Sequence, residues 1–270
     1  MAAEATLRPM IRTERHGDVV RVEMSNRRSR LAGFSVSAFL VRGMLVDTGF
    51  PGVGDDVERL LASERLQGIL VSHFHEDHAG NIAAAARRGI PIAAHPDTLA
   101  YARAPERLAF YRRFAWGSAP PLTSPVTPFD PEGLEMIHTP GHSPEHQVVW
   151  DSSTGTLFSA DLFIGVKVRV AHEYEEPRRL VESLQRVVAL APARVFDAHR
   201  GLVADGLSAL RAKLAWTEDL IGRVDAMARE RIPPARIVRE VLGPSDWTDH
   251  ISRGEYSRAN LVRAILREGA

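Results

Sequence analysis

Residues 72–81 read Ser-His-Phe-His-Glu-Asp-His-Ala-Gly-Asn, and this stretch decides which fold we expect. Four side chains that can ligate a metal fall within six positions, namely His73, His75, Asp77 and His78. The first two are two residues apart, so in an extended segment they point to the same face. The second two follow where we expect the chain to turn into a helix. One short loop can therefore offer imidazoles to one metal and an Asp–His pair to a neighbouring one, a donor set that suits zinc, iron or manganese.

Three more side chains of the same chemical kinds occur further along the chain. They are His142 after the apolar run 134–137, Asp161 after the run 156–160, and His199 after the run 193–196. Each lies just past the C-terminal end of a predicted strand, where open sheets commonly place their sites. We therefore expect these three side chains to join the loop at 72–81.

The pattern His-x-His-x-Asp-His, followed by a separated His, Asp and His, resembles the metallo-β-lactamase fold superfamily. Asp47-Thr48-Gly49, after the apolar run Met44–Val46, matches a further landmark of that family. The resemblance spans Asp47 to His199, and every ligand position is filled. It implies an α/β fold, a four-layer αββα sandwich. We expect a catalytic domain over 1–203, with a helical insertion around 97–128, and a helical C-terminal extension over 204–270.

Carried over position by position, the resemblance implies two metal ions. The first would be held by His73, His75 and His142, the second by Asp77, His78 and His199, with Asp161 bridging both. Two such cations bind a water between them and lower its pKa toward neutrality, which gives a bridging hydroxide as nucleophile. Zinc is the first expectation, and iron or manganese fits these ligands nearly as well. Asp77 is also the candidate catalytic residue, placed to pass a proton.

The function that this resemblance implies is a dinuclear metal-dependent hydrolase acting on a small ester, thioester or lactone, where the substrate rests on analogy. One alternative of the same fold is a sulfur dioxygenase with a single iron held by two histidines and an aspartate, against which the filled second site counts. Another is a nucleic-acid-processing hydrolase, which the balanced charge of the C-terminal region disfavours. A non-catalytic binding protein would be expected to have lost ligands, and none is lost.

The composition of the chain limits which metal ligands, partners and cellular location we expect. The chain has 270 residues, with 34 acidic and 34 basic side chains and no cysteine. The balanced charge gives no reason to expect a nucleic-acid or membrane partner, and without cysteine only imidazole and carboxylate remain as metal ligands. The N-terminus has no apolar run of signal-peptide length, and no stretch approaches the ~20 apolar residues of a membrane span. We expect a cytoplasmic protein with a small-molecule substrate, and leave a homodimer open.

Hydrophobic patterning predicts strands that alternate with helices, as in an α/β sheet. The predicted strands are 19–24, 34–46 with a turn at Arg42-Gly43, 68–71, 91–94, 134–138, 146–151, 156–160 and 193–196. The predicted helices are 53–63, 81–88, 176–190, 207–229, 235–242 and 257–267. We expect the aromatic residues of the insertion to pack onto the domain rather than to wall the site. Asp47 is expected to support a ligand rather than to be one, and His138 and His146 to satisfy local hydrogen bonds.

Overall fold

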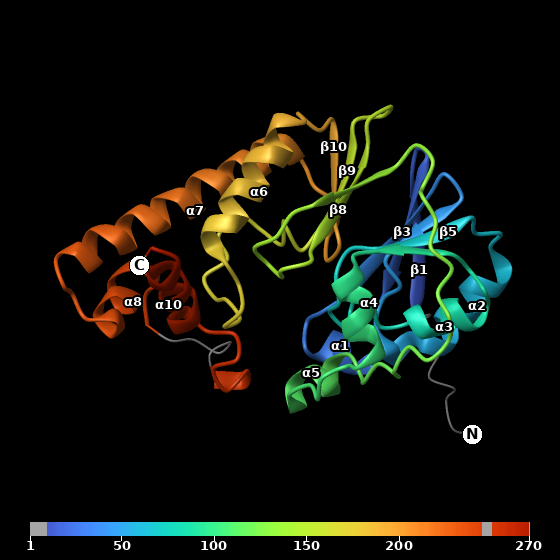
Figure 1. Cartoon of the computed structure of the whole chain (residues 1–270), viewed down its shortest axis with the longest axis horizontal. Helices are drawn as coiled ribbons and strands as arrows, with labels where there is room; N and C mark the ends of the chain where they lie inside the picture. The colour runs from blue at the N-terminus through green and yellow to red at the C-terminus, as the bar shows by residue number, and fades with distance from the viewer. Residues whose placement is uncertain (1–9, 245–249, 270) are drawn as a thin grey trace, which may run out of the picture.

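The computed structural model describes residues 10–244 and 250–269 (Figure 1). Its strands are β1 (Ile11–His16), β2 (Val19–Met24), β3 (Val36–Val41), β4 (Met44–Val46), β5 (Gly68–Val71), β6 (Ile92–Ala94), β7 (Glu135–His138), β8 (Gln147–Asp151), β9 (Thr156–Ala160), β10 (Arg194–Asp197) and β11 (Gly201–Leu202). Its helices are α1 (Arg27–Leu31), the 3-10 turn Pro51–Val53, α2 (Gly54–Ser63), α3 (Ile82–Arg87), α4 (Pro96–Arg103), α5 (Phe110–Ala115), α6 (Pro177–Ala189), α7 (Gly206–Arg229), α8 (Pro234–Leu242) and α10 (Arg258–Glu268).

The strands form two sheets. The first has six strands in the order β1-β2-β3-β4-β5-β6, and the second has five in the order β11-β10-β9-β8-β7. Strands β4, β5 and β6 run parallel in the first sheet, and β9 and β10 run parallel in the second. The carboxyl ends of these parallel strands carry the loops that hold most of the predicted ligands.

Alternation of side chains along the strands produces the layers. In β9, Leu157 packs toward the helices while Phe158 packs between the sheets. Val195 and Phe196 divide in the same way in β10. Because successive side chains of a strand point to opposite faces, each sheet is buried on both sides. Helices α2 and α3 cover the outer face of the first sheet, and α6 and α7 cover that of the second (Figure 1). The predicted αββα sandwich is confirmed.

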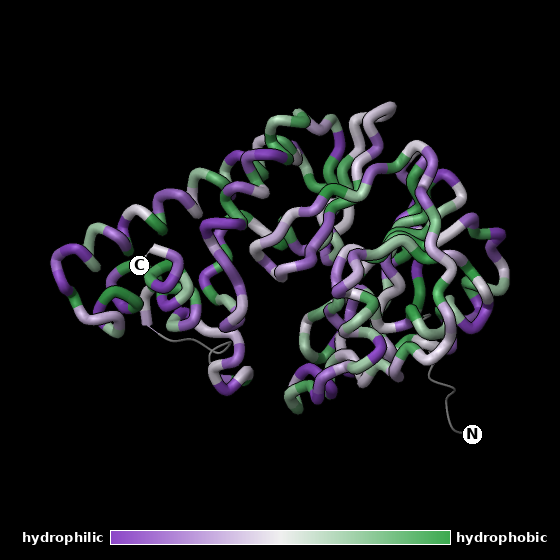
Figure 2. Tube along the Cα trace, viewed as in Figure 1, coloured by the Kyte–Doolittle hydropathy of each residue, from purple (hydrophilic) through white to green (hydrophobic). Residues whose placement is uncertain are grey.

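Apolar side chains concentrate in these layers, as the hydropathy colouring of the strands shows (Figure 2). A further apolar cluster lies among the C-terminal helices and includes Val224, Ile237, Val262 and Ile265. Helix α7 contributes to both regions, because its Leu210 packs on the second sheet while Val224 packs in the helical cluster. The division into domains at 203/204 stays a prediction. Among the described helices, none combines the length and the hydropathy needed to cross a bilayer.

Several local expectations were wrong or incomplete. Strand β1 and helix α1 were not predicted, and the short strand β11 follows His199, after which no strand was expected. In the insertion, Trp116 packs on Phe50 with ring centroids 4.8 Å apart, as expected. Phe110 and Phe114, in contrast, are 72% and 42% exposed, so the expectation that the rings pack onto the domain fails for them. Phe110 and Phe114 stand on either side of two arginines on the short helix α5, and this helix does not bury both of its faces.

Candidate metal centre

The seven predicted ligands meet at one end of the sandwich, in two groups. His73, His75, His142 and Asp161 offer ligand atoms that all lie within 4.8 Å of one another, and so do Asp77, His78 and His199. The loop at 72–81 begins at the carboxyl end of β5, Asp161 follows β9, and His199 follows β10. Parallel strands place their carboxyl ends at the same edge of a sheet, which explains why segments distant in sequence converge here.

The first group is built around His75. Its Nδ1 lies 2.9 Å from Nε2 of His73 and 3.1 Å from Nε2 of His142. Oδ2 of Asp161 lies 3.4 Å from Nε2 of His142 and 4.0 Å from Nε2 of His73. All four residues are buried. Three imidazole nitrogens therefore converge on one small volume, with a carboxylate oxygen at its edge.

The second group faces the other oxygen of the same carboxylate. Oδ1 of Asp161 lies 3.2 Å from Nε2 of His78 and 3.3 Å from Nε2 of His199. Oδ2 of Asp77 lies 3.9 Å from each of these two nitrogens. Asp161 thus presents one oxygen to each group, which is the arrangement expected of a bridging ligand.

The donor atoms fit the two cations that the resemblance implies. Nε2 of His78 and Oδ1 of Asp161 are fully buried and have no hydrogen-bond partner in the described part of the chain. A buried polar atom without a partner is costly and calls for an explanation such as an ion. Imidazole nitrogen and carboxylate oxygen are the donors that zinc uses in catalytic sites, and they also suit iron and manganese. The residues present therefore fit two divalent cations.

Asp47 supports the second group without being part of it. Its Oδ2 accepts a hydrogen bond from Nδ1 of His78 at 2.8 Å. The same carboxylate accepts from the backbone N–H of Ser72 at 2.8 Å and from its hydroxyl at 2.9 Å. Asp47 has a φ of 63°, a left-handed conformation that is uncommon for a residue with a side chain. Its geometry is that of a support for His78, as its place after β4 predicted.

Other ligand histidines also have a fixed outer nitrogen. Nδ1 of His73 lies 3.0 Å from the Ser72 hydroxyl, and Nδ1 of His199 lies 3.0 Å from the backbone carbonyl of residue 35. Nε2 of His75 bonds to the hydroxyl of Tyr174. Such partners fix which ring nitrogen carries the proton and leave the other nitrogen free for a metal.

The loops that carry His142 and Asp161 are also fixed by close contacts. A Cβ added at Gly141, whose φ is 135°, would lie 2.5 Å from the Cα of Leu180 on α6, so glycine is required there. The backbone N–H of Asp161 donates to Nε2 of His146, and Nδ1 of His146 bonds to Thr139. His146 therefore satisfies local hydrogen bonds, as expected, and also positions Asp161. His138 bonds locally, to the carbonyl of residue 144.

The candidate ligand histidines differ in protonation. Burial acts to lower the pKa of His142 in the first group, but Glu175 and Asp161 outweigh it and raise that pKa. Burial, together with neighbouring imidazoles, lowers the pKa of His73 and of His75 well below the usual range. Burial also opposes a charge on His78 and His199, but the neighbouring carboxylates together outweigh it, namely Asp161 and Asp77 for both and also Asp47 for His78. As a result the pKa of His78 lies well above its usual range and that of His199 is raised to about 9. Burial acts to raise the pKa of Asp161, but these two imidazoles outweigh it and hold that pKa well below the usual range.

Several residues of this region were not predicted from the sequence. Glu76, within the motif, accepts from Nε of Arg112 on α5 at 2.8 Å, and Nη1 of Arg112 donates to Glu255 near the C-terminus at 3.0 Å. Glu175 and the buried Lys213 lie beside His142 and Asp161. No spacing rule links these positions, since each comes from a different segment.

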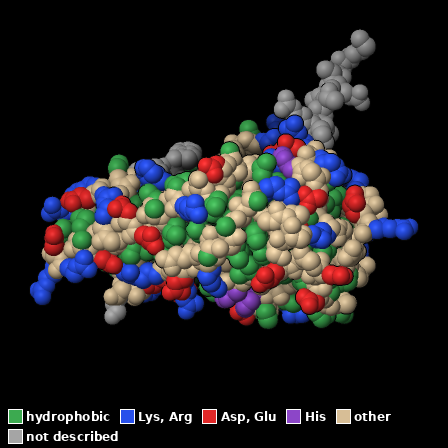
Figure 3. All heavy atoms as spheres, turned by 90° about the horizontal axis from the view of Figure 1, so that it is seen from above, with side chains coloured by type: hydrophobic (Ala, Val, Ile, Leu, Met, Phe, Trp, Pro, Cys, Tyr) green, Lys and Arg blue, Asp and Glu red, His purple; other side chains and the backbone are tan. Residues whose placement is uncertain are grey.

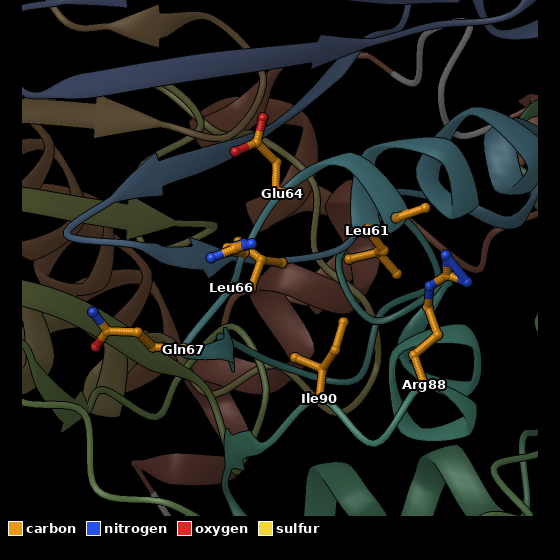
Figure 4. A pocket seen from close by; sticks show the side chains of 8 residues that line it. Leu61, Glu64, Leu66, Gln67, Arg88 and Ile90 are labelled. Carbon is orange, nitrogen blue, oxygen red and sulfur yellow. The ribbon is translucent and has the colours of Figure 1, made fainter.

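A surface hollow with a volume of about 610 Å³ lies away from the candidate metal ligands (Figure 4). It is lined by Leu61, Ala62, Glu64, Arg65, Leu66, Gln67, Arg88 and Ile90. These residues precede β5 and β6, so the hollow lies at the amino ends of the strands, away from the metal ligands. None of these eight lining residues belongs to a group of side chains suited to a metal.

Comparison with known proteins agrees with this geometry. A Caenorhabditis elegans protein named beta-lactamase-like protein 2 homolog is 26% identical over 242 residues, covering 82% of this chain and 72% of its own. The Bacillus subtilis (strain 168) protein named probable metallo-hydrolase YybB is 32% identical over 127 residues, covering 46% of this chain and 58% of its own.

Solved structures share the fold at low identity. A metallo-beta-lactamase family protein from Thermus thermophilus superposes with a TM-score of 0.63 at 19% identity, covering 87% of this chain and 90% of its own. The FIM-1 metallo-beta-lactamase from Pseudomonas aeruginosa, in its mono-zinc form, gives 0.60 at 14% identity over 79% and 97%. The sequence profile described as the metallo-beta-lactamase superfamily matches residues 31–210. The profile, the fold and the ligand geometry agree, and the chain belongs to the metallo-beta-lactamase superfamily.

Proposed function

We propose that the protein is a hydrolase that uses two divalent cations, zinc in the first place, to cleave a small ester, thioester or lactone. The observation that carries the proposal is Asp161, whose two oxygens face two separate groups of ligand atoms. When bound, such cations activate water as a nucleophile and polarise a carbonyl oxygen. The printed name of the Bacillus subtilis relative, a probable metallo-hydrolase, supports the same reaction class.

The chain's own residues have distinct tasks in this reaction. Asp161 and the five histidines would hold the cations. Asp77, whose side chain is 11% exposed, is the member of the second group placed to hold a proton at Oδ2 and to pass it to the leaving group. Asp47 orients His78, and Tyr174 orients His75. Burial of the ligands excludes bulk water and strengthens each electrostatic interaction at the centre.

Charge distribution favours a small substrate over nucleic acid. Basic and acidic side chains are interspersed over the face seen in Figure 3, where the described residues form no continuous basic groove. Phosphate-backbone binding would require such a groove. We also propose that the protein acts in the cytoplasm. Which of an ester, a thioester or a lactone it cleaves, and whether it forms a homodimer, are questions for experiment.

The test begins with protein purified without added metal, whose metal content is measured by mass spectrometry. We expect two zinc or manganese ions per chain, and hydrolysis of an ester, thioester or lactone that stops on chelation and returns on reloading. Asp77→Asn should retain metal and lose turnover by about 10²–10⁴-fold, the range for a general acid–base group. Asp219→Asn, an exposed change on α7, serves as its control. A single tightly held iron, with oxygen uptake on sulfur substrates and no hydrolysis, would contradict the proposal.

A further inference from the structure

Lys213 on α7 is a buried lysine in a chain that otherwise uses arginine. Lysine and arginine together number 34, and only Lys167 and Lys213 of these are lysines. Lys167 is exposed, whereas Lys213 is 2% exposed. Lysines are almost never fully buried unless they are paired. The position of Lys213 therefore requires a reason.

No partner in the described part of the chain supplies that reason. There the ammonium of Lys213 forms neither a hydrogen bond nor an ion pair, and its one close aromatic contact is Phe163, whose ring centroid is 5.9 Å from Nζ. Burial lowers the pKa of Lys213 to about 8, although Glu175, Asp161 and Asp197 act in the opposite direction. The amino group is thus buried without a partner at bonding distance.

Lys213 lines a recess that it shares with the metal centre. The recess has a volume of about 30 Å³, and His142, Asp161 and Glu175 line it as well. Most of the remaining wall is apolar, including Trp216 and Leu220. A water needs roughly 10–15 Å³ of such space, so a group of two or three heavy atoms fits. Glu175 is engaged elsewhere, because its Oε1 accepts from the backbone N–H of His172 at 2.9 Å and its Oε2 lies 3.8 Å from Nδ1 of His142.

We propose that Lys213 and this recess form an anion subsite that receives a carboxylate borne by the acyl part of the substrate. The proposal rests on the proposed function and narrows its substrate class to esters, thioesters or lactones of acids with a second carboxylate. A carboxylate has the size of the recess, and its oxygens supply the hydrogen-bond acceptor that Lys213 lacks in the described part of the chain. Lysine carries its charge on a compact ammonium, which takes up less of the recess than the broad planar guanidinium of arginine would. The apolar wall strengthens the attraction by excluding water.

The experiment measures binding rather than turnover. Succinate and butyrate have equal chain length and differ in one carboxylate, and their dissociation constants for the metal-loaded protein are measured by titration calorimetry. We expect succinate to bind about tenfold or more tightly than butyrate, as a charge-assisted hydrogen bond would give. Lys213→Met should reduce the preference for succinate, so that the two dissociation constants differ by about threefold or less. Equal constants would mean that the protein does not recognise the second carboxylate. Lys167→Met, the matched change at the exposed lysine, should leave the ratio as it is.

Metal content and thermal unfolding are checked for each variant, and Lys213→Gln provides a second test if Lys213→Met does not fold. An unchanged succinate-to-butyrate ratio in both variants of Lys213 would overturn the subsite. Succinate preference that depends on Lys213, in a protein that hydrolyses no ester, thioester or lactone, would support the subsite and reject the proposed function. Equal hydrolysis of matched succinyl and butyryl thioesters, with no binding preference, would reject the subsite alone.

Discussion

The two groups of ligands occupy one site but are built on different electrostatics. In the first, burial keeps His73 and His75 neutral, because their pKa values lie well below the usual range. In the second, carboxylates surround His78 and His199, and the pKa of both is raised. Since a metal binds the neutral imidazole, His73 and His75 are ready to bind, whereas His78 and His199 must first lose protons. His142 of the first group must also lose a proton, because Glu175 and Asp161 raise its pKa against the effect of burial. The two groups thus differ in how many histidines must lose a proton before a metal binds, which are His142 in the first group and both His78 and His199 in the second.

The largest expected effect comes from removing what the two groups share. Asp161→Asn replaces the carboxylate whose oxygens face both groups. We expect loss of metal from both, with affinity falling beyond the roughly 10–100-fold that an outer supporting residue is worth. Metal content by mass spectrometry checks this, with Asp219→Asn as control. Retention of one full equivalent of metal would show that Asp161 serves one group only.

A smaller effect should separate the groups. Asp47→Asn weakens the hydrogen bond to Nδ1 of His78, and Tyr174→Phe removes the one to Nε2 of His75. Each should lower metal affinity about 10–100-fold at its own group, and leave the other group unchanged. Chelator competition followed at each binding step measures the two affinities. Equal weakening of both steps by either variant would mean that the groups act as one unit.

The smallest effect is in protons released on metal binding. The pKa of the His199 imidazole is raised to about 9, so in the metal-free protein it is protonated at pH 7. Its contribution to stability is complete below about pH 6.5, its ordinary pKa, and is lost as the pH rises through about 9. Metal binding at about pH 7 should therefore release protons, and at about pH 10, above that raised pKa, release fewer. Calorimetry in buffers of different ionisation enthalpy counts them, and equal release at both pH values would contradict the difference between the groups.

Much of the fold was predictable because its signals are local. The run Gly68–Val71 is wholly apolar and short, and it forms β5. The repeat of apolar residues at helical spacing over 176–190 forms α6 at Pro177–Ala189. Strand β1 escaped prediction because it is an edge strand whose burial is low, so its sequence carries no strong alternation of apolar residues. Periodic burial leaves a pattern in the sequence, and an exposed edge does not.

Lys213 was predictable from the sequence only in part. It is three residues after Leu210 and four before Thr217, and all three are buried on the same face of α7. A lysine within a buried helical face is a visible signal in the sequence. What lies opposite that lysine is not visible, because the recess is formed by the loop before α6, by His142 and by Asp161.

The sequence by itself determined which side chains are the candidate ligands, most of the strands that precede them and the superfamily, since spacing and hydrophobic period are properties of short segments. Only the tertiary structure decided that Tyr174 bonds to His75, that His146 positions Asp161, and that Arg112 joins Glu76 to Glu255. The physical reason is that these relations depend on distances between segments far apart in the chain. Such distances are set by how the two sheets and their helices pack, and no local pattern encodes them.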